Sequence, residues 1–197
     1  MGRSPGNSDK LWKLIIALWV PCILAVAWIT VIDVQDVQVQ PLSSDEYLVK
    51  SAFLYNFAKF TEWPAQESAD ESIPINICIL GVDPFDGALE TIKGKTAQNR
   101  NLEIKHVARV EDLKACHILF ISASERNHLP RILDALKDSP VLTVGDMKEF
   151  AQQGGIINLT TEQNKIGLEI NVEAAERAGL KISSKLLKLA KIVRSKL

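Results

Sequence analysis

The chain has 197 residues, enough for one good-sized domain and an additional segment but short for two full domains. Apolar residues make up 47% of it and charged residues 24%, which excludes a collagen-like, coiled-coil or mostly disordered chain. The formal net charge of −1 is unevenly distributed, because residues 14–176 hold 13 basic against 23 acidic residues, a net charge of −10. This acidic body argues against a nucleic-acid-binding protein.

The N-terminus has the pattern of a signal peptide or a membrane anchor. Residues 14–32 are 19 positions without a charge, long enough to cross a hydrocarbon layer about 30 Å thick. Arg3, Lys10 and Lys13 precede this stretch and favour a cytoplasmic N-terminus, so the rest of the chain is expected on the other side of the membrane, outside the cytoplasm. An Ala-Val-Ala sequence at 25–27 matches a cleavage site, but the apolar run continues beyond it. Export after cleavage and tethering to the inner membrane therefore both stay open.

The chain is expected to divide into three parts. Residues 1–32 form the signal peptide or transmembrane signal anchor. Residues 33–42 are polar and rich in glutamine, and they include a proline, as is typical of a short linker. Residues 43–197 form the folded domain.

This domain is expected to open with a helix that ends at Trp63. Ser43 and Glu46 supply an N-cap and its capping-box partner, and apolar side chains, Phe57 among them, then recur at helical spacing. The sequence favours packing of these aromatic rings in the core against a sheet. The alternative is an aromatic face, including Phe57 and Trp63, that contacts a partner or an apolar ligand.

Apolar strands and short helices alternate along the rest of the domain. The expected strands are residues 75–82, 102–107, 117–123 and 140–144, followed by a hairpin of 156–159 with 166–170. The expected helices are residues 85–93, 111–115, 129–137, 147–153, 172–178 and 183–196. This order predicts an α/β fold: a single-domain three-layer sandwich whose mostly parallel sheet ends in a C-terminal antiparallel hairpin and carries helices on both faces.

Sheets of this kind bind ligands beyond the carboxyl ends of their parallel strands. Gly81, Asp83 and Ser122 follow two of the apolar strands, which makes them candidate residues for a small-molecule-binding module. Asp83, Asp86 and Asp146 are also candidates for an acidic site, but aspartates after strands are more often helix caps.

No motif in the sequence specifies catalysis, a cofactor or a metal. The turn after the first strand lacks both a G-x-G-x-x-G pattern and a Walker lysine, and neither G-x-S-x-G nor S-x-x-K occurs. His106, His117 and His128 fall on three different expected elements, without the spacing of a helical zinc site. We therefore expect a non-enzymatic protein that needs neither a cofactor nor a metal.

Cys78 and Cys116 are the cysteines that follow the apolar N-terminal stretch. In an oxidising compartment an even number of cysteines indicates one disulfide. Two unpaired buried thiols are the alternative, because the sequence alone does not show the geometry.

Basic and apolar residues alternate near the C-terminus. Over residues 183–196 the leucines lie opposite Lys185, Lys188 and Lys191 if the segment is a helix, which predicts a basic amphipathic helix. Such a helix either packs on the domain or offers a basic patch to an acidic protein or to lipid headgroups. The hairpin before it presents an edge where another chain can dock.

Six sequence blocks occur in a fixed order. They are YLVKSAFLYNFAKFTEWP (47–64), ICILGVDPF (77–85), ACHILFI (115–121), PVLTVGD (140–146), FAQQGG (150–155) and LEINVEAAERAGLKISSKLLKL (168–189). This ordered set resembles the YfiR family. The helix ending in Trp-Pro and the Glu-Ile-Asn strand before the Leu-rich tail are its most specific parts.

The resemblance implies a non-enzymatic periplasmic regulator. Proteins like it bind and repress the sensor part of a membrane-bound diguanylate cyclase, and thereby control cyclic di-GMP signalling and biofilm formation. An outer-membrane, peptidoglycan-associated lipoprotein can sequester such a repressor. The resemblance also implies pairing of Cys78 with Cys116, whereas this chain lacks a second family cysteine pair around residues 147–155. As partner-contacting residues we expect Phe57, Trp63, Lys185, Lys188 and Lys191, and a homodimer stays open.

Overall fold

The structure is a computed structural model that describes residues 42–64, 72–163 and 165–196. These residues belong to one unit that begins at Pro41. The expected leader and nearly all of the expected linker lie outside the described residues. Within the described ranges, no helix has both the length and the apolar character that crossing a bilayer requires.

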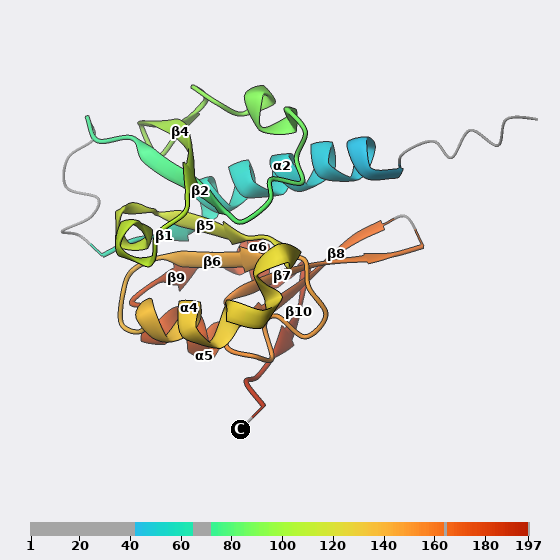
Figure 1. Ribbon diagram of the computed structural model, residues 1–197. Helices are drawn as coiled ribbons and strands as arrows, with labels where there is room; N and C mark the ends of the chain where they lie inside the picture. Colours follow the sequence, from blue (N-terminus) through green and yellow to red (C-terminus); the bar gives the residue numbers. More distant parts are fainter. Residues whose placement is uncertain (1–41, 65–71, 164, 197) are drawn as a thin grey trace, which may run out of the picture. The chain divides into compact units, whose positions relative to one another are not determined.

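An eight-stranded sheet organises the domain, in the spatial order β10-β8-β7-β6-β5-β2-β4-β3 (Figure 1). The strands are β2 (Ile75–Leu80), β3 (Thr96–Ala97), β4 (Arg100–Val107), β5 (Ile118–Ile121), β6 (Leu142–Gly145), β7 (Ile157–Glu162), β8 (Lys165–Asn171) and β10 (Ala190–Val193). The central strands run parallel, and β7 and β8 form an antiparallel hairpin. The predicted α/β fold, with its mostly parallel sheet and C-terminal hairpin, is confirmed.

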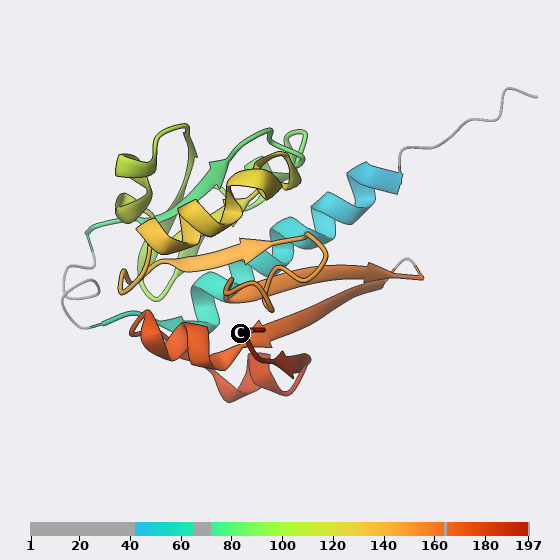
Figure 2. The ribbon, with the colours of Figure 1, turned by 60° about the horizontal axis from the view of Figure 1, so that its bottom comes forward.

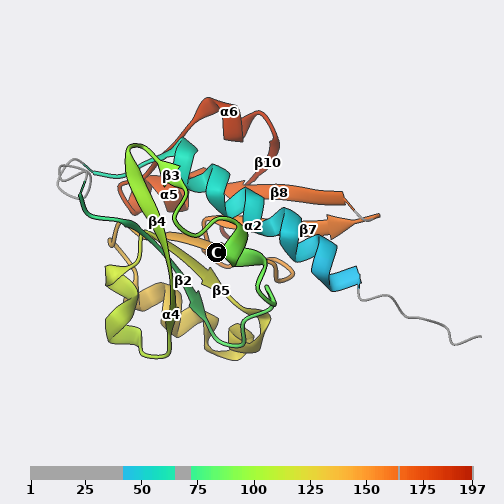
Figure 3. The same cartoon turned by 90° about the horizontal axis from the view of Figure 1, so that it is seen from above.

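Helices cover both faces of this sheet (Figure 3). They are α2 (Leu42–Phe60), α4 (Leu129–Ala135), α5 (Val172–Arg177) and α6 (Ser184–Leu187), with the 3-10 turns η1 (Ala88–Thr91), η2 (Val110–Ala115) and η3 (Ala123–His128). A separate antiparallel pair joins β1 (Thr61–Glu62) to β9 (Lys181–Ile182), next to the end of α2.

Two hydrophobic clusters pack on opposite faces of the central strands. Every residue of β2 is buried, as expected of a parallel strand covered on both sides. Because side chains alternate along a strand, Ile77 and Ile79 face Phe57 of α2, whereas Cys78 and Leu80 join the cluster that contains Ile132 of α4.

Cys78 and Cys116 form a disulfide, with their Cα atoms 5.9 Å apart. The bond joins β2 to the residue that lies just before His117 and β5. The predicted pairing is confirmed, and the alternative of two unpaired thiols is wrong.

The predicted C-terminal helix over residues 183–196 is wrong. The helix ends at Leu187, and Ala190–Val193 instead form β10, which pairs in parallel with β8. Pairing with β8 satisfies backbone groups along one side of this segment and buries Val193, so tertiary contact outweighs the local helical pattern.

The predicted helix over residues 147–153 is also wrong. Those residues form a succession of turns in which Glu149 has a φ of +63°. The turns place the Phe150 ring against Gly145, where an added Cβ would lie 2.7 Å from the ring. A regular helix cannot pass through the left-handed conformation at Glu149.

Candidate functional site

The predicted ligand residues at the end of β2 contact a neighbouring turn of this chain. Ser124 Oγ of η3 accepts a hydrogen bond from the backbone N–H of Val82 at 3.0 Å. A Cβ added at Gly81 would collide with Ser124 Oγ and would lie 2.9 Å from Cγ of Glu125. The η3 turn therefore packs directly on Gly81, and Ser122 is buried at its start.

Asp83 stabilises the turn after β2. Its Oδ1 accepts a hydrogen bond from the backbone N–H of Phe85 at 2.8 Å, and its Oδ2 lies 2.7 Å from Nε2 of His106. Asp86 is exposed in the same turn, whereas Asp146 follows β6. Asp83 thus stabilises a local turn but does not cap the following 3-10 turn, whose N-cap is Gly87 without a side-chain hydrogen bond. Asp146 instead contacts Tyr47 and Lys50 of α2.

A cavity of about 400 Å³ lies at the carboxyl end of β6. It is lined by residues from the first half of α2, from the start of η3, from the turn after β6 and from β7: Glu46, Tyr47, Lys50, Ala123, Asp146, Met147, Lys148, Asn158, Leu159, Thr160 and Thr161. The β7–β8 hairpin extends past the neighbouring strands beside this half of α2 (Figure 2). The cavity therefore lies beyond the carboxyl ends of the parallel strands, where α/β proteins generally bind their ligands.

An ion cluster centred on Lys50 lines this cavity. Lys50 Nζ lies 2.7 Å from Oδ2 of Asp146 and 2.6 Å from Oε1 of Glu46, and the lysine side chain is only 3% exposed. The hydroxyl of Tyr47 donates a hydrogen bond to Oδ2 of Asp146 at 2.8 Å. A buried lysine side chain is costly without polar partners, so these two carboxylates stabilise Lys50 at this position.

The pKa values of Tyr47 and Glu46 are shifted in this environment. Burial and the hydrogen bond to Asp146 raise the pKa of Tyr47, so its phenol stays protonated and acts as a donor. Burial by itself raises the pKa of Glu46, but contacts from Lys50 and Thr161 outweigh this effect and leave the pKa lowered. Glu46 is therefore ionised at neutral pH.

Sequence reasoning did not identify Lys50. The sequence does indicate that Lys50 lies on the buried side of the helix. It precedes Leu54 by four residues and Phe57 by seven, and both of these are fully buried in the core. A lysine on the buried stripe of a helix needs an anionic partner. The pairing with Asp146, 96 positions away, has no local signal.

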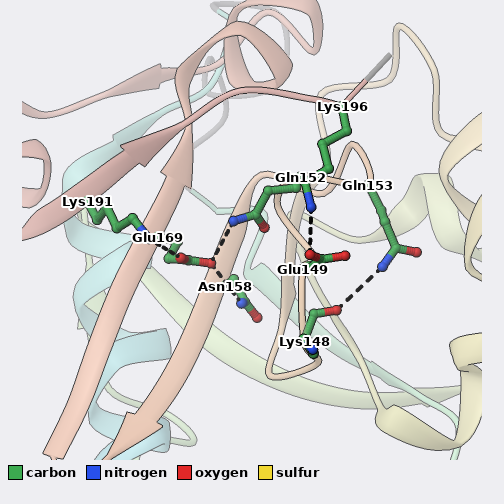
Figure 4. Close-up of polar contacts among 8 residues, drawn as sticks. All are labelled: Lys148, Glu149, Gln152, Gln153, Asn158, Glu169, Lys191 and Lys196. Atoms are coloured by element: carbon green, nitrogen blue, oxygen red, sulfur yellow. Dashed lines mark hydrogen bonds and ion pairs between the residues drawn. The ribbon is translucent and has the colours of Figure 1, made fainter.

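A second polar cluster surrounds Glu169 of β8 (Figure 4). Its Oε2 accepts hydrogen bonds from Nε2 of Gln152 and Nδ2 of Asn158, both at 3.2 Å, and its Oε1 lies 3.1 Å from Nζ of Lys191. Burial raises the pKa of Glu169, but these three donors outweigh it and leave the pKa lowered. Nearby, Lys196 pairs with Glu149 at 2.6 Å. The cluster thus connects β10 and the last described residues to the turns after β6.

The basic residues near the C-terminus lie on α6, β10 and the turn between them. We define the C-terminal surface as Lys185, Lys188, Leu189, Lys191 and Ile192, all of which are exposed. Leu189 is 72% exposed and Ile192 52%, both high values for large apolar side chains. Because β10 is an edge strand, one side of its backbone faces away from the sheet.

The aromatic candidates lie elsewhere. Phe57 has no exposed surface, and Trp63 is almost completely buried, with its ring 5.8 Å from the His117 ring. The structure thus favours the core interpretation of these rings, and the partner-contacting candidates that remain exposed are the lysines.

Metal-ligating side chains do not gather in the described part of the chain. Among residues 42–64, 72–163 and 165–196, no group of three or more His, Cys, Asp or Glu side chains could hold a metal ion.

Comparison with solved structures finds similar but divergent chains. A Streptococcus pneumonia ABC domain in complex with L-Trp is 12% identical with a TM-score of 0.43, and the match covers 60% of this chain and 54% of that one. A conserved domain protein from Vibrio cholerae is 13% identical with a TM-score of 0.44 at the same coverage. CD0873, a substrate binding protein with adhesive properties from Clostridium difficile, is 8% identical with a TM-score of 0.45, and the match covers 67% of this chain and 58% of that one. The chain thus matches little more than half the length of each.

Comparison with protein families gives a match over most of the domain. A family model described as YfiR/HmsC-like matches residues 47–191, from the first turns of α2 into β10. These limits enclose the six sequence blocks on which the resemblance to the YfiR family was based. The chain belongs to the YfiR/HmsC-like family.

Proposed function

We propose that this protein binds and represses the sensor part of a membrane-bound diguanylate cyclase in the periplasm, and thereby controls cyclic di-GMP signalling and biofilm formation. Membership of the YfiR/HmsC-like family supports a periplasmic regulatory role. The disulfide between Cys78 and Cys116 accords with an oxidising compartment. An outer-membrane, peptidoglycan-associated lipoprotein is the proposed antagonist that sequesters the repressor.

The observation that carries the proposal is the C-terminal surface. It combines exposed Leu189 and Ile192 with several lysines, on the edge of the sheet. Lys191 pairs with Glu169, but neither Lys185 nor Lys188 forms an ion pair with any residue that the structure describes. Lys185 Nζ lies 5.5 Å from the centroid of the Phe60 ring and has no carboxylate partner in the described residues. Apolar side chains supply binding energy and cations without a carboxylate partner supply selectivity, so this surface suits an acidic partner.

The geometry also suggests how the partner docks. An extended segment of the sensor can add to the free side of β10, where backbone groups have no strand partner in the described domain. Acidic side chains on that segment would face Lys185 and Lys188. Such a contact should weaken as the salt concentration rises, because exposed charges are screened.

The test compares two charge-reversal variants of the full chain in cells that lack the native gene. In Lys185→Glu/Lys188→Glu the reversal falls on the C-terminal surface. In the control, Lys114→Glu/Lys137→Glu, it falls on exposed lysines of η2 and of the segment after α4. We expect deletion to raise cyclic di-GMP, the control to restore the low level, and the C-terminal variant to fail.

Crosslinking followed by mass spectrometry identifies the partner in the same cells. Capture of a membrane diguanylate cyclase by the native chain and the control, but not by the C-terminal variant, supports the proposal. It is wrong if deletion leaves cyclic di-GMP unchanged, and the assignment of the surface is wrong if both variants restore repression equally.

A further inference from the structure

The outer face of α2 carries large apolar side chains that no part of the described domain covers. Leu48 is 47% exposed and Val49 46%, and Ala52 is exposed one turn further along the helix. A helix on the surface of a soluble domain normally carries polar side chains on the face opposite to the core. Adjacent apolar side chains on such a face are typical of an interaction surface.

Contacts on both flanks of α2 show which residues form this outer face. On one flank, Tyr55 donates a hydrogen bond to the backbone oxygen of Thr96 in β3 at 3.2 Å. On the other flank, Glu46 accepts a hydrogen bond from Thr161 of β7 at 2.8 Å. The helix lies along one face of the sheet, held by these contacts (Figure 3). With about 3.6 residues per turn, the face between the two flanks is formed by six residues, which we call the α2 stripe: Asp45, Leu48, Val49, Ala52, Asn56 and Lys59.

The α2 stripe is acidic at its N-terminal end and basic at its C-terminal end. Asp45 and Lys59 are both exposed, and neither forms an ion pair with any residue that the structure describes. Lys59 Nζ instead lies 5.3 Å from the centroid of the Tyr55 ring. Charges of these signs also suit the dipole of the helix. The dipole does not, however, account for the exposed apolar residues between them.

The stripe is complementary to a second copy of itself in the antiparallel orientation. About a two-fold axis at Ala52, Asp45 of each copy lies opposite Lys59 of the other, whereas a parallel pair would bring like charges together. Positions 45, 49, 52, 56 and 59 are separated by four and three residues in turn, which is the spacing of the contact positions in paired helices. The small side chain of Ala52 at the centre allows the two helices to approach closely.

The apolar residues fit the same arrangement. Leu48 falls opposite Asn56 of the other copy, and Val49 falls opposite the partly exposed ring of Tyr55. Removal of Leu48 and Val49 from water in both copies favours association. Because each copy contributes a single helix, the contact is small, and we expect a weak and reversible dimer.

We propose that the α2 stripe is the contact between two copies of this chain, paired in the antiparallel orientation. None of its residues belongs to the C-terminal surface, and the pairing does not depend on the proposed repression of a cyclase.

Sedimentation equilibrium of the full chain in density-matched detergent micelles tests the pairing. We expect a dimer whose population rises with protein concentration. Asp45→Lys should weaken it about tenfold, because each dimer contains two Asp45–Lys59 pairs and the change makes both repulsive. The double variant Asp45→Lys/Lys59→Asp restores opposite charges and should bring the dissociation constant back to within about threefold of the native value. Asp134→Lys is the control, because this exposed residue lies on α4, and it should leave the dimer unchanged.

Three results of this experiment overturn the proposal. The first is a native chain without a concentration-dependent dimer. The second is a dimer that Asp45→Lys does not weaken, since such a dimer is held together elsewhere. The third is a double variant that associates no more tightly than Asp45→Lys.

Oxidative crosslinking of Ala52→Cys tests the position of the two-fold axis. Helix axes about 8–10 Å apart would place the two substituted positions within reach of a disulfide. We expect efficient crosslinking of Ala52→Cys to a second copy and little of the control Ala123→Cys, which is exposed at the start of η3 and retains the same native Cys22. Equal crosslinking of the two variants overturns the proposal.

The same variant identifies a different occupant of the stripe. In the full chain reconstituted into phosphatidylcholine vesicles, protection of Ala52→Cys from a water-soluble maleimide without crosslinking assigns the stripe to the lipid surface. Crosslinking in cells to another protein, and not to a second copy, assigns it to that protein. Either result overturns the proposal.

Discussion

Lys50 and Asp146 are 96 positions apart in the sequence, and their Nζ and Oδ2 atoms lie 2.7 Å apart in the fold. The contact connects the first half of α2 to the turn after β6, at the carboxyl end of the sheet. Both side chains are more than nine-tenths buried, so neither charge can be stabilised by solvent instead.

Replacement of Lys50 by methionine should therefore be strongly destabilising. The substitution keeps much of the side-chain volume but leaves Asp146 buried without its cation, which typically costs about 3–5 kcal/mol. Urea unfolding measures the loss. Lys93→Met is the control, because its pair with Glu90 is exposed and should contribute less than about 1 kcal/mol. Similar losses in the two variants would contradict the view that burial makes the Lys50 pair important.

The disulfide between Cys78 and Cys116 should contribute a second large share of the stability. It closes a loop between residues 38 positions apart, for which the chain-entropy relation gives about 4 kcal/mol. A reducing agent should lower the melting temperature of the native protein but not that of the Cys78→Ser/Cys116→Ser variant. If reduction lowers both melting temperatures equally, the effect does not come from this bond.

His117 should make the fold sensitive to mild acid. Burial, followed by the charges of Arg100 and Lys105, lowers the pKa of His117 to about 4. The backbone N–H of Asn76 donates to Nδ1 at 3.1 Å, and Nη2 of Arg100 lies 2.6 Å from Nε2. A fully protonated ring would therefore face donors at both nitrogens.

The direction of the pH effect follows from this shift. The unfolded chain binds the His117 proton near pH 6.5 and the folded chain only near pH 4. The share of the unfolding free energy that comes from burying a neutral His117 is fully present above pH 6.5. It is lost as the pH falls towards 4, and the loss is about 3 kcal/mol. Urea unfolding between pH 7 and pH 4 should show this loss in the native protein and in His106→Gln, whose ring is exposed, but not in His117→Gln. Equal pH dependence in all three proteins would assign the effect to other groups.

The sheet could be predicted from the sequence because its central strands carry their own signal. All six residues of β2 are buried, and five of them are apolar between turn-forming residues, so local pattern and tertiary environment agree. Near the C-terminus the local sequence pattern and the tertiary environment favour different structures. Leu186 and Leu189 lie opposite Lys188 and Lys191 in a helical repeat, but the free edge of β8 pairs with β10 and makes part of the segment a strand.

The candidate site could be predicted less well for a related reason. Its general position follows from the fold, because ligand sites gather at the carboxyl ends of parallel strands. The residues that form the site cannot be read from local sequence, because they depend on which helix packs beside the end of which strand. Glu46 was interpreted as a capping residue from its local sequence, whereas its carboxylate contacts Lys50 and Thr161, and the latter contact requires the β7–β8 hairpin to reach α2.

Trp63 offers a test that separates a core residue from a partner-contacting residue. The ring is buried beside His117, so Trp63→Ala should cost about 3–5 kcal/mol of unfolding free energy. Trp63→Phe should cost clearly less, because it fills much of the space and removes an indole N–H that has no hydrogen-bond partner in the described residues. Both variants should repress cyclic di-GMP synthesis in proportion to the amount of folded protein. A Trp63→Ala protein with native stability and no repression would instead place the ring at the partner surface.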